Sequence, residues 1–503
     1  MNITQILDIN SRKFGSRDCL RAGGRSWSYL ETRNQAERVA AFLQMKGVGK
    51  GDKVAIMSQN TPSFVFTFFG ALKAGASVAP INHKLAAPEA DYILSHSESK
   101  IFFFDGSLVE VAKKLPTSIL KICMDSPADG FEQLESIIPP ASSYQPVAIS
   151  ASDIAEILYT SGTTGKPKGC LHTHHGVVMA GITGAMAMKL DEQDRLLMAM
   201  PIWHSSPLNN WFMGIQYVGG VTVLIREYHP LHFLQAVQTE KCTVYFGAPI
   251  SYILPIQMIP QFKEFDLSSM RCWIYGGGPM AADTARTVME SYQSDNFYQV
   301  YGMTEAGPTG TVLFPRDQVT KAGSIGNRAL PGADLQVIRS DGKNATPGDI
   351  GEIWLQADSM THGYYKNPEA TKAAFEGGWY KTGDLVRMDA DGYLYIVDRL
   401  KDMIVTGGEN VYSKEVEDAI AGLPGVMETA VIGKPHPDWG ETVVCFIVPK
   451  KGETVDQEIL RQTLSGKLAR YKIPREFNIV EELPHTASGK VMKYTLRDLE
   501  RDE

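Results

Sequence analysis

The chain has 503 residues, of which 44% are hydrophobic and 21% charged, and its formal net charge is −8. This length exceeds the roughly 250 to 300 residues at which a single hydrophobic core stops growing, so we expect two or three domains. The composition is typical of a soluble globular protein and excludes a disordered or fibrous chain. The negative charge disfavours nucleic-acid binding, because phosphate backbones are bound by clustered Lys and Arg. We therefore expect small-molecule partners.

The six cysteines are scattered without a C-x-x-C pair, which indicates neither a zinc site nor a disulfide framework. The opening segment lacks the charged start and long apolar core of a secretory signal. The most apolar stretch, residues 64–76, contains Lys73 and is too short to span a membrane. We expect a cytoplasmic protein without a transmembrane segment, either monomer or homodimer. Contact with a membrane surface is left open by the sequence.

Apolar segments bounded by Gly and Pro alternate with helical stretches in the first two-thirds of the chain. The predicted strands are residues 52–58, 77–81, 100–105, 221–225, 242–249 and 270–278. Helices are predicted near residues 64–76 and 87–97. This alternation is typical of parallel βαβ units and predicts layered α/β subdomains.

The pattern of predicted elements changes between residues 322 and 398. Short strands with Gly turns predict a small β-barrel there. Beyond the segment 398–402 the chain returns to a mixed α+β pattern, with helices predicted at 414–425 and at the end of the chain. We therefore place a domain boundary at residues 398–402. The fold class is α/β and multi-domain.

The stretch "YTSGTTGKPKG" at residues 159–169 has the composition of a phosphate cradle. Glycine frees the backbone to present its N–H groups, and hydroxyls and a cation complete such a site. The stretch does not match the P-loop pattern, because Gly162 and Gly165 are too close and Pro167 follows Lys166 where Ser or Thr would bind magnesium. A P-loop phosphotransferase is therefore disfavoured. Taken alone, the loop could equally be a solvated turn.

Five further motifs support a functional interpretation of this loop. They are "MPIWHSSP" (200–207), "QVYGMTEAGP" (299–308), "GWYKTGDL" (378–385), "DRLKDMIVTGGENVYSKEVE" (398–417) and "LPHTASGKVMK" (483–493). With these motifs in order, nearly the whole chain resembles the adenylate-forming superfamily, which contains acyl-CoA synthetases, firefly-type luciferases and the adenylation domains of peptide synthetases. The resemblance implies that a carboxylate attacks the α-phosphate of ATP to give acyl-AMP and pyrophosphate, after which an acceptor displaces AMP.

The resemblance also implies domains and roles. The large N-terminal domain would be 1–398, the hinge 399–402 around Lys401, and the mobile C-terminal lid 403–503. Lys490 matches the catalytic lysine, which offsets the repulsion between carboxylate and phosphate. Glu305 matches the ligand of Mg²⁺, and Thr304 beside it would bind the α-phosphate. Each could instead be structural, as a surface lysine or a turn residue.

The remaining nucleotide contacts follow from the same resemblance. The predicted ATP and AMP positions are Thr160, Ser161, Gly162, Thr163, Thr164, Gly165, Lys168, Gly278, Pro279, Gln299, Tyr301, Gly302, Asp384 and Arg399. Tyr301 offers an aromatic face to adenine, and Asp384 with Arg399 would hold the ribose. A structural salt bridge is the alternative for Arg399. Many relatives have Ala where this chain has Gly278.

The acceptor implied by the resemblance is CoA. The predicted CoA contacts are Gly407, Gly408, Trp439, Tyr471, Lys472 and Arg475. Glycines let the thin pantetheine arm approach the backbone, and basic and aromatic groups suit a phosphorylated adenosine. A solvated basic face is the alternative for the last four residues. A carrier protein in place of CoA is also left open.

His204 indicates which class of carboxylic acid is the substrate. Amino-acid adenylation domains commonly have a Phe-Asp pair here, whereas this chain has Trp203-His204, which matches acyl-CoA synthetases. The predicted acyl pocket comprises Trp203, His204, Gly276, Gly277, Met303 and Gly307. The neighbouring residues Trp211, Phe212, Met213 and Ile215 are either pocket wall or core. An apolar acid fits such walls.

The sequence thus predicts an AMP-forming acyl-CoA synthetase that uses ATP, Mg²⁺ and CoA. A medium- or long-chain fatty acid is the first expectation for its substrate, and an aryl or cycloaliphatic acid is the alternative. A nucleotide-binding protein without turnover would be expected to lack Lys490 or Glu305, and both are present.

Overall fold

The computed structural model describes residues 1–116, 118–160, 166–278, 280–407, 409–465, 467–485 and 491–500. The chain forms two compact units. The first comprises Met1–Leu335 and Leu355–Tyr380, and the second comprises Gln336–Trp354 and Lys381–Glu503. The change between units at Tyr380 precedes the predicted hinge at 399–402. That hinge stays a prediction, because compactness alone does not show where a chain bends.

A seven-stranded sheet forms one half of the first unit. Its strand order is β7 (Glu132–Gln133), β6 (Leu120–Cys123), β5 (Ile101–Phe104), β3 (Lys53–Met57), β4 (Ser77–Ile81), β8 (Ile154–Thr160) and β9 (Lys168–Thr173). β3 pairs in parallel with both β4 and β5, and β9 turns back antiparallel on β8. The predicted βαβ units are therefore confirmed here.

The helices of this half begin where their sequences favour it. α3 (Pro62–Lys73) starts with Pro62 at its first turn, and the Thr61 side chain accepts a hydrogen bond from the Phe64 N–H. Both features are typical helix-start signals. α4 (Ala87–Ser97) matches its predicted bounds. The other helices of the half are α2 (Tyr29–Met45), α5 (Val109–Lys114) and α6 (Leu134–Ile137).

An eight-stranded sheet forms the other half. Its order is β15 (Gly310–Leu313), β14 (Phe297–Gly302), β13 (Cys272–Gly276), β12 (Val244–Gly247), β10 (Arg195–Met198), β11 (Val221–Leu224), β1 (Asp18–Ala22) and β2 (Arg25–Ser28). The four pairings from β11 to β14 are parallel, which confirms the predicted second subdomain. Its helices are α9 (Pro230–Glu240), α10 (Pro249–Met258) and α11 (Ala282–Tyr292).

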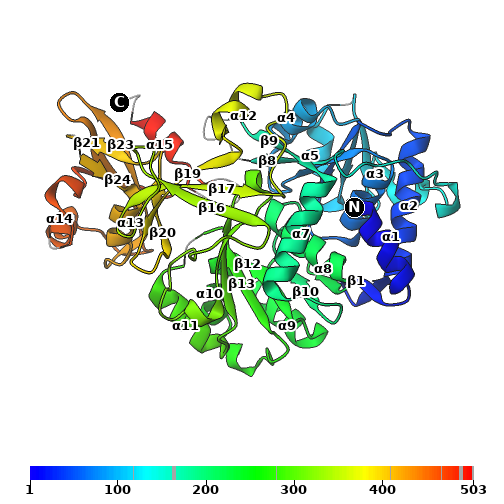
Figure 1. Ribbon diagram of the computed structural model, residues 1–503, viewed down its shortest axis with the longest axis horizontal. Coiled ribbons are helices and arrows are strands. Elements are labelled where there is room, and N and C mark those ends of the chain that lie inside the picture. The colour runs from blue at the N-terminus through cyan, green and yellow to red at the C-terminus, as the bar shows by residue number, and fades with distance from the viewer. Residues whose placement is uncertain are drawn as a thin grey trace. The chain divides into compact units, whose positions relative to one another are not determined.

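Helices α7 (His174–Met188) and α8 (Met213–Val218) lie side by side in the first unit (Figure 1). Glycines allow their close approach, because a Cβ at Gly181 would lie 2.9 Å from the Met213 Cβ and one at Gly214 would lie 2.9 Å from the Gly181 carbonyl oxygen. α8 is preceded by the π-helix η3 (Ser206–Phe212). Short π-helical segments are frequent at functional sites.

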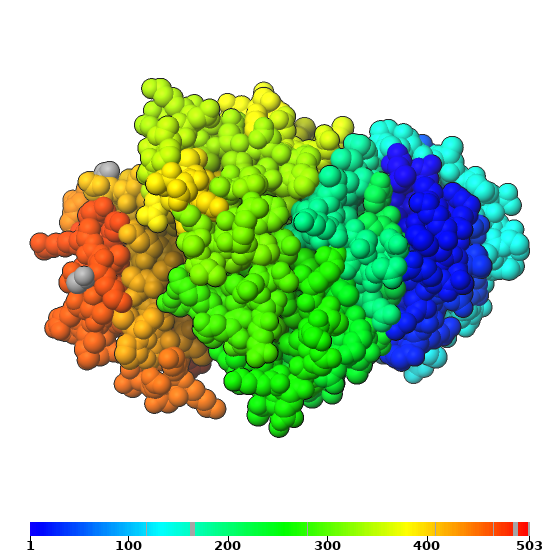
Figure 2. Space-filling view, turned by 60° about the horizontal axis from the view of Figure 1, so that its bottom comes forward, coloured from blue at the N-terminus to red at the C-terminus, as the bar shows by residue number. Residues whose placement is uncertain are grey.

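The N-terminal helix α1 (Ile3–Lys13) covers this pair. Figure 2 shows the N-terminal segment, in blue, against the blue-green segments that contain α7 and α8. Asn10 donates a hydrogen bond from Nδ2 to the Gln216 carbonyl oxygen, and the Ile3 N–H donates to His174 Nδ1 over 3.4 Å. No helix in the described part of the chain is both long and apolar enough to cross a membrane.

The second unit holds most of a five-stranded sheet. Its order is β16 (Ala333–Ile338), β17 (Ile350–Ala357), β19 (Trp379–Met388) and β18 (Phe375–Glu376), with β20 (Leu394–Arg399) paired to β19. A further sheet has the order β22 (Glu409–Val411), β21 (Ile404–Thr406), β24 (Gly440–Pro449) and β23 (Val426–His436), with β25 (Glu476–Ile479) beside β24. The short strands predicted between residues 322 and 398 are confirmed, whereas the small β-barrel stays a prediction, because β16 and β18 stand at the two ends of this strand order.

Helices α13 (Ser413–Ala421), α14 (Gln457–Ser465) and α15 (Lys493–Leu499) complete the second unit. α13 ends four residues before the predicted limit at residue 425. The reason is local, since Gly422 caps the helix, Pro424 cannot continue it, and Gly425 has a φ of +79°.

Candidate active site

The glycine-rich loop joins the two strands of the β8–β9 hairpin. Thr160 lies opposite Lys168 in the pairing, and its hydroxyl donates to the Lys168 carbonyl oxygen over 3.5 Å. The hairpin therefore brings these two predicted phosphate ligands to the base of the loop. Five other predicted ligands, Ser161, Gly162, Thr163, Thr164 and Gly165, lie outside the described residues.

Glu305 lies in η5 (Thr304–Ala306), a short 3₁₀ turn that follows β14. Its side chain is buried, with 7% of the residue exposed, and Oε1 accepts a hydrogen bond of 2.9 Å from the Tyr364 hydroxyl. Burial, and then the charge of Glu305, raise the pKa of Tyr364 far above its usual value. Tyr364 therefore stays a hydrogen-bond donor to the carboxylate.

Tyr364 also faces the β8–β9 hairpin. The Lys168 Nζ lies 5.0 Å from the centre of the Tyr364 ring. The segment around Tyr364 pairs with β9, because the Leu171 N–H donates to the Gly363 carbonyl oxygen over 2.9 Å and the Tyr365 N–H donates to the Gly169 carbonyl oxygen over 2.7 Å. The β8–β9 hairpin and Glu305 are thus connected through one tyrosine. Sequence reasoning missed this residue, because it lies outside every motif.

Thr304 is connected to the motif that precedes η3. Its hydroxyl lies 2.9 Å from the Ser205 hydroxyl. Ser205 directly follows Trp203 and His204, the two residues predicted near the carboxylate of the acid. His204 is exposed, and its ring centre lies 5.8 Å from that of Trp203. The predicted acid site and the predicted α-phosphate site are therefore adjacent in the first unit.

The predicted adenine site lies at the ends of β13 and β14. Gln299 is opposite Tyr275 in the pairing, and its Oε1 accepts a hydrogen bond of 3.4 Å from the Tyr275 hydroxyl. Among the described residues other than their chain neighbours, no heavy atom lies within 4 Å of where a Cβ of Gly277 or Gly278 would be. Tyr301 is half-buried and Gly302 is exposed. Pro279 lies outside the described residues.

Packing alone explains two glycines of the predicted acyl pocket. A Cβ at Gly307, whose φ is +69°, would overlap the Ser359 carbonyl oxygen, and a Cβ at Gly276 would lie 2.7 Å from the Val300 carbonyl oxygen. Their place in a pocket wall stays a prediction, as does that of the half-buried Met303. Of the two alternatives for the neighbouring aromatic and aliphatic residues, core packing is the observed one. The residues buried there are Trp211, Phe212, Met213 and Ile215.

The predicted ribose ligands lie together in the second unit. Asp384 on β19 is opposite Arg399 on β20, and the Arg399 Nε lies 2.6 Å from the Asp384 Oδ1. Asp384 is buried, with 3% of the residue exposed, and its N–H donates to the Thr382 hydroxyl over 3.0 Å. The salt bridge proposed as the alternative for Arg399 is thus present. The salt bridge also orients the Asp384 carboxylate, so a structural role of Arg399 is compatible with ribose binding by the pair.

The predicted CoA ligands also gather in the second unit. The Gly407 N–H donates to the Trp439 carbonyl oxygen over 2.9 Å, and the Arg475 guanidinium lies 3.1 Å from the centre of the Trp439 ring. Lys472 pairs with Glu415 at 2.7 Å. Tyr471 and Lys401 are exposed, whereas Gly408 and Lys490 lie outside the described residues.

Comparisons with known proteins agree with these motifs. Residues 7–365 match the family model "AMP-binding enzyme", and residues 415–490 match "AMP-binding enzyme C-terminal domain". The long-chain-fatty-acid–CoA ligase FadD13 of Mycobacterium tuberculosis is 36% identical, with 94% of this chain and 92% of the relative covered. A feruloyl-CoA synthase of an Amycolatopsis species is 34% identical, with 95% of each covered.

A solved structure gives the same result for the fold. ATP-bound MatB from Rhodopseudomonas palustris aligns with a TM-score of 0.87 at 32% identity, covering 100% of this chain and 99% of the other. The chain belongs to the AMP-binding enzyme family, in the acyl-CoA synthetase branch of the adenylate-forming superfamily. It is an AMP-forming acyl-CoA ligase that uses ATP and CoA.

Proposed function

We propose that the ligase acts on an apolar carboxylic acid, in the first place a medium- or long-chain fatty acid. The observation that carries the proposal is the Ser205–Thr304 hydroxyl contact of 2.9 Å, which sets the Trp203-His204 segment beside the α-phosphate motif. Trp203 supplies an apolar wall there, and apolar walls favour the burial of hydrocarbon. Similarity to a long-chain-fatty-acid–CoA ligase supports the same class of acid.

An aryl acid is the second candidate. The half-buried Trp203 ring, held by its hydrogen bond of 2.9 Å to His83, also offers a flat aromatic face. Such a face suits a planar ring, since aromatic pairs prefer offset stacking. Similarity to a feruloyl-CoA synthase supports this candidate.

Glu305 is proposed to hold Mg²⁺ that arrives with ATP. Mg²⁺ takes one or two carboxylates and obtains its other ligands from phosphates and water. The site fits that demand, because the buried Glu305 carboxylate spends one hydrogen bond on Tyr364 and keeps further acceptor capacity. Within the described ranges no group of three or more His, Cys, Asp or Glu could hold a metal by itself. A metal shared with phosphate is consistent with a single carboxylate.

Each of the other predicted site residues would serve one of the two half-reactions. Lys168 and the loop would hold the β- and γ-phosphates, Thr304 the α-phosphate, and Asp384 with Arg399 the ribose. Lys490 would offset the charge that develops as the carboxylate attacks. After adenylation, rotation of residues 403–503 about Lys401 would bring Gly407 and Trp439 to CoA. All six cysteines are buried free thiols, which supports a reducing, cytoplasmic location.

The test is acid-dependent exchange of labelled pyrophosphate into ATP, followed by CoA-dependent release of AMP. Fatty acids of graded length and a set of aryl acids are compared by kcat/KM. Highest values for fatty acids support the first candidate, and highest values for aryl acids support the second. Lys490→Ala should abolish exchange but retain thioester formation from preformed acyl-AMP. No exchange with any acid would contradict the proposal.

A further inference from the structure

The segment of residues 199–205, here named the acyl loop, carries Trp203 and His204. It leaves the carboxyl end of β10 and enters η3, and most of it is neither helix nor strand. Such backbone cannot satisfy its own polar groups, so its shape must be fixed by contacts from elsewhere. Those contacts come from the seven-stranded sheet.

Asn60 makes most of them. Its Nδ2 donates to the carbonyl oxygens of Met198 at 3.2 Å, Met200 at 3.1 Å and Ile225 at 3.1 Å. Its Oδ1 accepts from the Ile202 N–H at 2.8 Å. Asn60 is 4% exposed, so these bonds face no competition from bulk water. One carboxamide thus fixes the acyl loop on both sides of Met200, and the end of β11 beside it.

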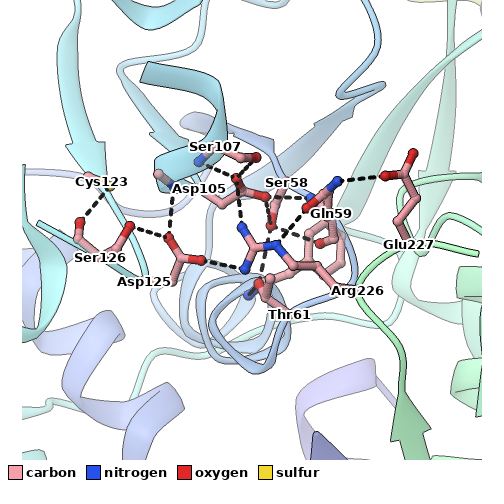
Figure 3. Close-up of polar contacts among 12 residues, drawn as sticks. Ser58, Gln59, Thr61, Asp105, Ser107, Cys123, Asp125, Ser126, Arg226 and Glu227 are labelled. Atoms are coloured by element: carbon pink, nitrogen blue, oxygen red, sulfur yellow. Dashed lines mark hydrogen bonds and ion pairs between the residues drawn. The ribbon is translucent and has the colours of Figure 1, made fainter. Parts of the chain in front are cut away.

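Asn60 is itself held in place by the ion pairs of Figure 3. Its N–H donates to the Arg226 carbonyl oxygen at 3.1 Å. The Arg226 guanidinium pairs with Asp105 at 3.1 Å and Asp125 at 2.9 Å, and donates to the Gln59 Oε1 at 2.6 Å (Figure 3). Asp105 is fully buried, and it accepts from the Gln59 N–H at 2.7 Å. Gln59, the residue before Asn60, is therefore held through both its main chain and its side chain.

The place of this cluster in the sheet is informative. Asp105 follows β5 and Gln59 follows β3, and the strand order turns between these two strands, with β4 on one side and β6 on the other. In open α/β sheets the carboxyl edge at such a turning point is where ligands bind. Here Arg226, from the end of β11, fills the place of a ligand. The seven-stranded sheet uses this edge to hold the eight-stranded one.

A second contact fixes the side chain of Trp203. Its Nε1 donates to the His83 Nδ1 at 2.9 Å, and the two ring centres lie 6.1 Å apart at 71°. Because Nδ1 accepts, the His83 proton is on Nε2 in the neutral ring. His83 follows β4, so it too belongs to the seven-stranded sheet. The main chain and the indole of the acyl loop are thus anchored separately.

We infer that Asn60 and His83 are positioning residues for the acid substrate, which hold the acyl loop so that Trp203 and His204 keep one geometry toward it. The inference rests on the proposed role of these two residues in acid binding. A loop that shifts by a fraction of an ångström lowers the fit of the acid directly, whereas it touches the proposed nucleotide ligands only through the Ser205–Thr304 contact. Loss of either anchor therefore acts more strongly on the acid than on ATP.

The first experiment compares Asn60→Ala with Asn10→Ala in pyrophosphate exchange. Asn10 is a matched control, because it is a buried asparagine of the same unit that donates to a main-chain oxygen, that of Gln216. We expect Asn60→Ala to raise the KM for the acid about tenfold and to change the KM for ATP less than about twofold. Asn10→Ala should change neither KM. Equal effects of the two variants on the KM for the acid would overturn the inference.

The second experiment decides the matter even if Asn60→Ala fails to fold. His83→Phe and Trp203→Phe each remove one partner of the hydrogen bond but keep an aromatic ring, and the double variant closes a cycle. We expect each change to raise the KM for the acid, with little further rise in the double variant, and His83→Gln to restore part of the loss through its acceptor oxygen. Additive effects without rescue would overturn the role of His83.

The two experiments also separate this inference from the proposed function. No exchange by the unmodified enzyme with any acid would overturn both. Normal exchange by the unmodified enzyme, combined with an unchanged KM for the acid in the Asn60 and His83 variants, would overturn the inference alone.

Discussion

The predicted phosphate site of the first unit and the predicted CoA site of the second are built in opposite ways. Glu305 is 7% exposed and contacts Tyr364, a residue distant in the sequence. Trp439 is 37% exposed and contacts Gly407 and Arg475 within the second unit. Burial strengthens electrostatic interactions with a phosphate at the cost of desolvation. An exposed ring and cation suit a ligand that arrives in the second step.

The largest loss of activity is expected from substitutions at the buried Glu305 site. Glu305→Gln removes the charge proposed to hold Mg²⁺, and pyrophosphate exchange should fall about 100- to 1000-fold, as for other charge-stabilising groups in active sites. Tyr364→Phe keeps the ring beside Lys168 and removes only the 2.9 Å hydrogen bond to Glu305. Exchange by this variant should fall by no more than about tenfold. Both rates are measured at saturating acid and ATP.

A loss in Tyr364→Phe as large as that in Glu305→Gln would contradict this ranking. It would mean that the tyrosine, rather than the carboxylate, carries the interaction with the nucleotide. A loss below about tenfold in Glu305→Gln would remove Glu305 from the proposed metal site, since even a single hydrogen bond to a charged group contributes that much.

The folding stability of the first unit should also depend on pH. Glu156 on β8 is fully buried, lies opposite His172 in the β8–β9 pairing and accepts one hydrogen bond of 3.2 Å from Asn209. Burial raises the pKa of Glu156 from 4.5 to about 8. Between these values the folded protein keeps the proton while the unfolded chain has lost it. The stability from this group is complete below pH 4.5 and is lost as the pH rises toward 8.

Glu156→Gln should remove this loss. The stability of the variant relative to the unmodified protein should rise by about 1.4 kcal/mol per pH unit across the window. Denaturant unfolding of the first unit, followed by fluorescence at several pH values, measures the difference. The exposed Glu110, replaced by Gln, serves as the control and should show no such rise. A flat difference for Glu156→Gln would show that the carboxyl group is ionised in the folded protein.

The smallest effect on catalysis is expected from substitution of the exposed Trp439. Trp439→Ala removes the ring under Arg475, and the KM for CoA should rise about 3- to 30-fold, the range of a cation–π contact of moderate strength. Pyrophosphate exchange should not change, because CoA takes no part in the first half-reaction. Trp354→Ala is the matched control, since this ring also lies under a cation of the second unit, Lys381 at 5.9 Å. Equal effects on the KM for CoA would contradict a role for Trp439.

Much of the fold follows from local patterns in the sequence. The predicted strand at 77–81 and helix at 87–97 have the bounds of β4 and α4. Their periodicity and end signals lie within the elements themselves, so no distant contact is needed to recognise them. The helix predicted at 414–425 extends four residues too far, because Gly422 and Pro424 end the helix after Ala421. Breakers decide helix ends more strongly than the apolar pattern does.

The class of chemistry could be predicted from the sequence, because motifs such as "YGMTE" and "YTSGTTGKPKG" resemble those of the adenylate-forming superfamily. How these motifs meet could be seen only in the folded protein. Tyr364, Asn60 and His83 lie outside the motifs, and their partners are distant in the chain. The tertiary structure also gave Gly307 its packing against Ser359. Spacing along a chain records which groups are available, whereas distances across a fold depend on how its sheets and helices pack.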